Sequence, residues 1–138
     1  MDRAEAPHPA SIEALMQNEP LLREYAYLVA RGVRALALVG RFSAEPRRMF
    51  ECVSALECAS EAGVVPFVID CGDGFAVAGY AAARWALDLY QWTFTDGVPD
   101  EQRHRIVGLL LGYAPDAIRQ FEESAAGRRF DLPTPQAG

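Results

Sequence analysis

The chain has 138 residues, of which 51% are hydrophobic and 23% charged. A chain of this length buries roughly two thirds of its unfolded surface. We therefore expect a single globular domain that needs neither disulfides nor a structural metal. The longest uncharged apolar run, residues 74 to 83, is about half of the ~20 residues that cross a bilayer, and residues 1 to 10 lack the build of a signal peptide, so we expect a cytoplasmic protein without a membrane span. The net charge of −6 excludes broad phosphate-backbone binding, argues against direct nucleic-acid binding and favours a partner with a basic surface.

The first predicted elements are a helix and a strand. Apolar side chains spaced three and four apart over residues 12 to 29 predict a helix with Ser11 as its cap. Pro20 should kink this helix or split it in two. A glycine ends the helix, and residues 33 to 39 then predict a short buried strand. Residues 40 to 43 are expected to connect that strand to the next helix.

A second helix and a second strand follow. Pro46 in a first helical turn and the apolar stripe over residues 49 to 59 predict an amphipathic helix. Residues 64 to 70 predict the next strand, and Pro66 places it at a sheet edge or at its first pairing position. Strand, helix and strand within about 38 residues is the length of a parallel crossover, so we expect the two strands to lie side by side or nearly so.

A tight turn is predicted at residues 71 to 74, because the sequence Asp-Gly supports a positive backbone φ. Residues 75 to 79 would then return antiparallel to the preceding strand. The stretch from 69 to 74 resembles the first phosphate loop of the actin and sugar-kinase ATPase superfamily, in which such a turn holds a Mg²⁺-phosphate group. That superfamily needs two domains and several further motifs, so a plain hairpin turn is the favoured interpretation.

The aromatic-rich part of the chain comes next. One helical face carries Trp85, Leu89 and Trp92, and another carries Leu87, Tyr90 and Phe94. A helix with so wide an apolar arc is either sandwiched inside the domain or half exposed to a partner. Residues 90 to 94 also alternate apolar and polar side chains at a period of two, so a strand is the alternative here.

Two further helices complete the predicted elements. Acidic residues after Pro99 begin a helix that runs to Leu111, and Pro115 begins a last helix to about Ala126. The pair has the rhythm of a helix-turn-helix, but its second helix carries three acids against Arg119 alone, which is the wrong charge for a DNA major groove. We therefore favour a helical hairpin that serves the core.

The predicted fold class is α+β. A small mixed three-stranded sheet packs with about five helices, and a β-α-β-β core precedes the C-terminal helical hairpin. The single domain is expected over residues 11 to 131. Residues 1 to 10 and 132 to 138 contain prolines among small and charged residues, so both are expected to be loose tails.

Residues 106 to 118, with His104 and Arg105 before them and Phe121 after them, resemble the tail of small uncharacterised proteins encoded by phages and mobile elements of GC-rich bacteria. Small acidic accessory proteins of such elements include anti-CRISPR and other anti-defence inhibitors. The resemblance implies stoichiometric binding to a host defence complex rather than a chemical reaction, and it assigns no catalytic residue.

The sequence thus predicts a non-enzymatic protein-binding accessory or inhibitor protein. Aromatic side chains at the centre with charges around them are typical of interface hot spots. The candidate partner-binding residues are Trp85, Asp88, Tyr90, Trp92, Phe94 and Asp96. The competing interpretation of the aromatic residues is burial in the domain's own core, and it is the favoured one for Trp85.

The alternative function is a small hydrolase or transferase that uses the turn residues Asp70, Cys71 and Asp73 together with His104. A deep pocket where these four residues meet would support the enzyme, and a flat surface with exposed aromatic residues would support the binding protein. Three cysteines without a C-x-x-C pair give no zinc signature and no disulfide framework. We expect reduced thiols, no bound metal and no cofactor.

Overall fold

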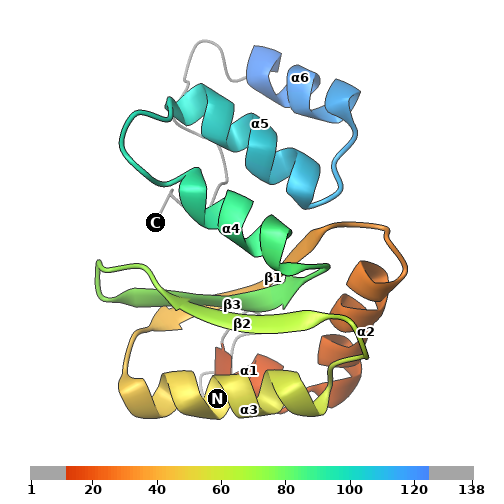
Figure 1. The fold of residues 1–138 in the computed structure, drawn as a ribbon, viewed down its shortest axis with the longest axis vertical. Helices are drawn as coiled ribbons and strands as arrows, with labels where there is room; N and C mark the ends of the chain where they lie inside the picture. Colours follow the sequence, from red (N-terminus) through yellow and green to blue (C-terminus); the bar gives the residue numbers. More distant parts are fainter. Residues whose placement is uncertain (1–11, 125–138) are drawn as a thin grey trace, which may run out of the picture.

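A computed structural model of the protein describes residues 12 to 124, so the predicted tails lie outside the described residues. Six helices and three strands are formed within this range (Figure 1). They are α1 (Ile12–Met16), α2 (Glu19–Ala30), β1 (Leu36–Ser43), α3 (Pro46–Cys58), β2 (Val65–Asp70), β3 (Phe75–Ala81), α4 (Arg84–Trp92), α5 (Asp100–Leu110) and α6 (Pro115–Ser124). The α+β class with three strands is confirmed.

The three strands form one sheet in the order β1-β3-β2. Both pairings are antiparallel, so the predicted mixed sheet is wrong. The tight turn after β2 makes β3 pair with β2 as a hairpin. The free edge of β3 then pairs with β1. β1 and β2 run in the same direction, as a crossover through α3 requires, but β3 lies between them. β2 is an edge strand, which confirms the place predicted for Pro66.

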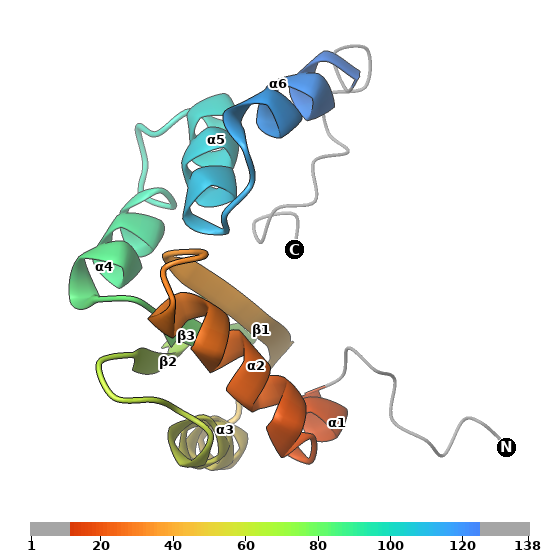
Figure 2. The same ribbon diagram turned by 90° about the vertical axis from the view of Figure 1, so that its right-hand side faces the viewer.

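Helices cover both faces of the sheet (Figure 2). α1, α2 and α3 lie on one face, while α4 and α5 lie on the other and α6 extends the second layer. Each face has its own cluster of buried apolar side chains. The central strand β3 alternates between them: Ala76, Ala78 and Tyr80 belong to the first cluster, and Val77 and Ala81 to the second.

Gly79 in β3 is required by close packing. A Cβ atom placed there would lie 2.1 Å from the carbonyl oxygen of Ala37 in β1 and 2.9 Å from the ring of Phe67 in β2. Only a residue without a side chain allows both neighbouring strands to approach this closely. Gly79 therefore lies at the point where β1 and β2 flank β3 and the Phe67 ring packs over it.

The N-terminal helix is split near Pro20, as predicted. α1 ends at Met16 and α2 begins at Glu19. The side-chain oxygen of Asn18 accepts a 3.2 Å hydrogen bond from the backbone N–H of Leu21, which caps the second helix. The predicted cap Ser11 and the predicted helical residues beyond Ser124 lie outside the described range.

The C-terminal helices form the predicted hairpin. Gly112 closes α5 with a φ of 91°, and α6 folds back along α5 (Figure 2). An ion pair of 2.9 Å between Arg105 and Glu122 joins the two helices. None of the helices between residues 12 and 124 is sufficiently long and apolar to span a membrane.

Candidate functional site

Residues 84 to 92 form the helix α4, so the strand alternative is wrong. The side of α4 that meets the sheet buries Ala86, Leu87 and Tyr90. Trp85 and Trp92 lie on the opposite side with exposed fractions of 59% and 50%. The wide apolar arc predicted for this helix therefore consists of two parts: one side is buried in the core, and the other is exposed on the surface. The interpretation that Trp85 is a core residue is wrong, because its side chain lies on the exposed side of α4.

The two exposed tryptophans are seven residues apart, which is close to two helical turns and places them on one side of α4. Asp88 lies between them and is exposed, and its carboxylate accepts a 2.9 Å hydrogen bond from Arg84. We call the surface formed by Trp85, Asp88 and Trp92 the α4 face. Asp96 is exposed in the connection that follows α4.

The connection after α4 is fixed by Arg103 of α5. Its Nε donates a 2.9 Å hydrogen bond to the carbonyl oxygen of Thr93, and its Nη1 donates to Asp100. The guanidinium also lies 5.2 Å from the centre of the Phe94 ring. Phe94 in turn meets Tyr90 edge to face at 5.2 Å. These contacts hold Phe94 beside the end of α4, although Arg103 carried no signal in the sequence.

A pocket of about 400 Å³ lies between the β2-β3 turn and α4. Its lining combines residues from the two competing sequence hypotheses with side chains that neither hypothesis included. The lining residues are Arg41, Ile69, Asp70, Cys71, Asp73, Val77, Tyr90, Gln91 and Phe94. We call this cavity the turn pocket.

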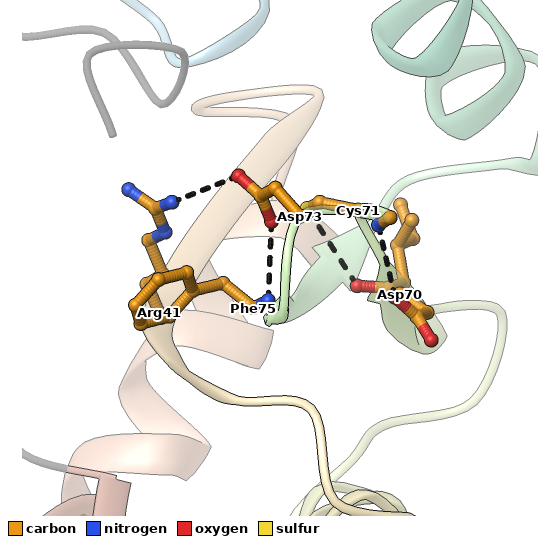
Figure 3. A network of polar contacts seen from close by, with 7 residues as sticks. Arg41, Asp70, Cys71, Asp73 and Phe75 are labelled. Carbon is orange, nitrogen blue, oxygen red and sulfur yellow. Dashed lines mark hydrogen bonds and ion pairs between the residues drawn. The ribbon is translucent and has the colours of Figure 1, made fainter.

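The carboxylates of the turn stabilise its backbone (Figure 3). Asp70 accepts a 2.9 Å hydrogen bond from the N–H of Gly72, and Asp73 accepts a 3.1 Å hydrogen bond from the N–H of Phe75. Gly72 and Gly74 have φ values of 84° and 92°, which glycine adopts without strain. The predicted hairpin turn is confirmed, and each carboxylate has one oxygen engaged in it.

Arg41 reaches the turn pocket because β1 contains a bulge. The register with β3 shifts between Leu38 and Gly40, so the alternation of side chains is reversed beyond that point. Arg41 is therefore opposite Val77, which lies on the α4 side of the sheet. There its guanidinium binds Asp73 at 3.2 Å (Figure 3) and lies 4.4 Å from the Phe75 ring centre.

The sequence did not predict this role for Arg41. Residues 40 to 43 were expected to connect a strand and a helix, but they extend β1 to Ser43. Their pairing with β3 depends on residues more than 30 positions away along the chain, which local patterns do not reveal. Neither Arg41 nor Gln91 carried a local signal that would have placed it at a pocket.

The enzymatic constellation is only partly assembled. Asp70, Cys71 and Asp73 all line the turn pocket, whereas His104 lies on α5 and is not part of its lining. Burial lowers the pKa of His104, and both ring nitrogens are buried without a hydrogen-bond partner among the described residues. Burial raises the pKa of the Cys71 thiol, and Asp73 and Asp70 raise it further against the opposing effect of Arg41. A raised pKa keeps the thiol protonated, and a protonated thiol is a poor nucleophile.

No group of three or more His, Cys, Asp or Glu side chains suited to a metal ion occurs between residues 12 and 124. The turn pocket offers the two carboxylates of Asp70 and Asp73, and each already accepts a backbone hydrogen bond. Comparison of the chain with protein-family models, with curated proteins and with solved structures found no match. The function of the turn pocket and of the α4 face is therefore inferred from the residues that form them.

Proposed function

We propose that the protein is a non-enzymatic binding protein that docks a basic protein surface on the α4 face. One observation carries this proposal. Trp85 and Trp92 are both at least half exposed on one side of a helix whose other side is buried in the core. Large exposed aromatic side chains that share a surface are typical of interaction sites, because their burial against a partner releases the most apolar area.

The charges around the α4 face favour a basic partner. Asp88 lies between the two tryptophans, and Asp96 is exposed beyond the end of the helix. The whole chain has a net charge of −6. Acidic groups at the rim of an interface accelerate encounter with a positive surface and repel nucleic acid, so a protein is the favoured partner.

The four residues of the alternative enzymatic hypothesis are not arranged for catalysis by a thiol. His104 is separate from the turn, so no base from that residue stands beside Cys71. A nucleophilic thiol needs such a base or a lowered pKa, whereas the pKa of Cys71 is raised. A small hydrolase or transferase built on Asp70, Cys71, Asp73 and His104 remains the second candidate, because three of these residues line one pocket.

The cellular context is part of the same proposal. The resemblance of the C-terminal stretch to phage and mobile-element proteins suggests an inhibitor of a host defence complex. The three cysteines Cys52, Cys58 and Cys71 are free, which fits a reducing cytoplasm. In that setting the protein would act by occupying a basic surface of the complex in a stoichiometric manner.

The first experiment identifies the partner by pull-down from the native host and mass spectrometry, and then measures its affinity for variants. We expect Trp85→Ala and Trp92→Ala each to weaken partner binding by more than about 1 kcal/mol, or roughly fivefold. Because both indoles are exposed, the unfolding temperature should stay nearly unchanged. Phe50→Ala is the matched control, since Phe50 is 72% exposed on α3, across the sheet from α4.

Two outcomes would contradict the proposal. One is an equal loss of affinity for Phe50→Ala and Trp92→Ala. The other is a loss of about 3 kcal/mol of stability in Trp92→Ala without a binding defect, which is the behaviour of a core residue.

The charge of the α4 face is tested by kinetics. Asp88→Arg should slow association with a basic partner, and the effect should shrink as salt rises, because salt screens exposed charges. Glu57→Arg is the control, since it changes the net charge by the same amount at an exposed position of α3. Equal slowing by both variants would mean that net charge, and not the α4 face, sets the rate.

A further inference from the structure

The turn pocket is a cavity next to the α4 face. Its volume of about 400 Å³ is near the lower end of the range for small-ligand sites, roughly 300 to 1,000 Å³. Ile69 and Val77 of the sheet and the rings of Tyr90 and Phe94 supply apolar walls. Asp70, Asp73 and Arg41 supply charged groups. A ligand of this pocket would therefore combine an apolar body with a charged end.

The charges of the pocket favour a cation. Two carboxylates and one guanidinium give the lining a formal charge of −1. Arg41 is already engaged, because it pairs with Asp73 and lies over the Phe75 ring. One oxygen of Asp70 accepts the Gly72 N–H, and the rest of the described chain offers this carboxylate no ion pair. Asp70 is thus the exposed carboxylate of the lining that is accessible to a cation.

The walls suit a flat cation on an apolar stem. A guanidinium stacks on aromatic rings and binds a carboxylate, and its methylene stem packs against aliphatic side chains. The chain already uses the guanidinium–ring contact three times within residues 12 to 124. Arg31 lies 4.9 Å from the centre of the Tyr27 ring, Arg41 lies 4.4 Å from that of Phe75, and Arg103 lies 5.2 Å from that of Phe94.

The turn pocket adjoins the α4 face. Gln91 lines the pocket and directly precedes Trp92 of the α4 face in the same helix. A partner that covers Trp92 therefore brings its own side chains to the mouth of the pocket. We infer that the turn pocket receives an arginine side chain of the basic partner, with its guanidinium bound by the pocket-lining residues Asp70, Tyr90 and Phe94. This inference rests on the proposed function and adds the residue that specifies the partner.

The test uses the whole protein and two short peptides, followed by NMR. An N-acetylated, C-amidated Gly-Arg-Gly peptide supplies the arginine, and the same peptide with citrulline keeps its shape without the charge. We expect the arginine peptide to shift the signals of residues 70 to 74 and of the Gln91 side chain, with a dissociation constant in the millimolar range. The citrulline peptide should bind at least about tenfold more weakly.

Asp70→Asn removes the charge but keeps an oxygen that can accept the hydrogen bond from Gly72. This variant should bind the arginine peptide about tenfold more weakly, and its NMR spectrum will report whether the hairpin is intact. Glu57→Gln is the matched control, because Glu57 is exposed on α3 and belongs neither to the pocket lining nor to the α4 face, and it should leave peptide binding unchanged. Equal binding of both peptides, no shifts at the pocket up to roughly 20 mM, or an unchanged affinity in Asp70→Asn would each overturn the inference.

The same variants separate this inference from the proposed function. Asp70→Asn should also weaken binding of the partner itself by about tenfold. If Trp85→Ala and Trp92→Ala weaken partner binding but Asp70→Asn leaves both peptide and partner binding unchanged, the arginine pocket is refuted and the α4 face stands. If the arginine peptide fills the pocket but the tryptophan variants bind the partner normally, the pocket stands and the α4 face is refuted.

Discussion

The hydroxyl of Tyr80 in β3 donates a 2.8 Å hydrogen bond to the carbonyl oxygen of Leu56 in the last turn of α3. Both residues are fully buried, so this bond ties the end of a helix to the centre of the sheet. The last carbonyl groups of a helix lack partners within the helix, and a buried one is costly unless a partner is supplied. The carbonyl oxygen of Leu56 accepts one hydrogen bond of 3.2 Å from the N–H of Ala59, and Tyr80 supplies a second partner.

Tyr80→Phe should lower the free energy of unfolding by about 1 kcal/mol, because it removes one buried hydrogen bond and preserves the packing of the ring. The measurement is urea denaturation followed by circular dichroism. Tyr27→Phe serves as the control, since Tyr27 is about half exposed. If both variants lose the same stability, the Tyr80 hydrogen bond contributes nothing measurable.

Stability should fall as the solution becomes alkaline. Burial raises the pKa of Tyr80 and Tyr90 in the folded protein, and it raises that of Cys52 to about 11 from 9.0. Above the unfolded pKa values, near 9 for the thiol and about 10 for tyrosine, the unfolded chain releases protons that the folded chain retains. The stabilisation is therefore complete below pH 9 and is lost as the pH rises through the folded values.

Urea denaturation between pH 8 and about pH 11 checks this dependence. Cys52→Ala removes the thiol, so its stability should fall less steeply than that of the parent protein over this range. The absorbance of ionised tyrosine gives an independent measurement, since Tyr80 and Tyr90 should ionise only on unfolding. A stability that stays constant to pH 11, or ionisation of these two tyrosines in the folded state at pH 10, would contradict the prediction.

Gly79→Ala should destabilise the sheet by about 3 kcal/mol, at the upper end of overpacking effects. The added methyl group would overlap the backbone of Ala37 in β1 and press on the ring of Phe67 in β2. Gly63→Ala is the control, because it measures the cost of backbone strain without a steric clash. Gly63 has a φ of 85° but open space around it, so its substitution should cost only about 1 kcal/mol. Thermal unfolding of the two variants should rank them in this order.

The three thiols should differ in reactivity and share no function. Cys58 and Cys71 are exposed and should react with a thiol reagent in the folded protein, whereas the buried Cys52 should react only on unfolding. Replacement of all three by serine should preserve partner binding, with a stability loss of about 1 to 3 kcal/mol from the hydroxyl buried at position 52. If Cys71→Ser alone abolishes activity while the fold is intact, thiol chemistry replaces the binding proposal.

Local chemistry explains what the sequence could predict. Pro20 lacks a backbone N–H and separates α1 from α2, and the glycines of residues 71 to 74 allow the hairpin that joins β2 to β3. Both features depend on residues close together in the chain. The class of fold and most helix boundaries follow from the same kind of signal.

Pairings between distant residues explain what the sequence could not predict. The order of the strands depends on which edge of β3 accepts β1, and a parallel crossover alone gives no information about a strand inserted between its ends. The turn pocket depends on the bulge near Val39, which turns Arg41 to the α4 side. The exposure of Trp85 depends on which sides of α4 the other elements cover, and periodicity within one helix does not contain that information.

The alternation of β3 divides the protein into two compartments. Side chains of odd-numbered β3 residues such as Val77 share a core with α4 and α5, while those of even-numbered residues such as Ala76 share a core with α1, α2 and α3. The two buried clusters have no residue in common. Substitutions can therefore accumulate in the cluster beneath the α4 face while the cluster on the other side of the sheet keeps its packing and stabilises the fold. A chain built in this way can change its partner during evolution without being redesigned throughout.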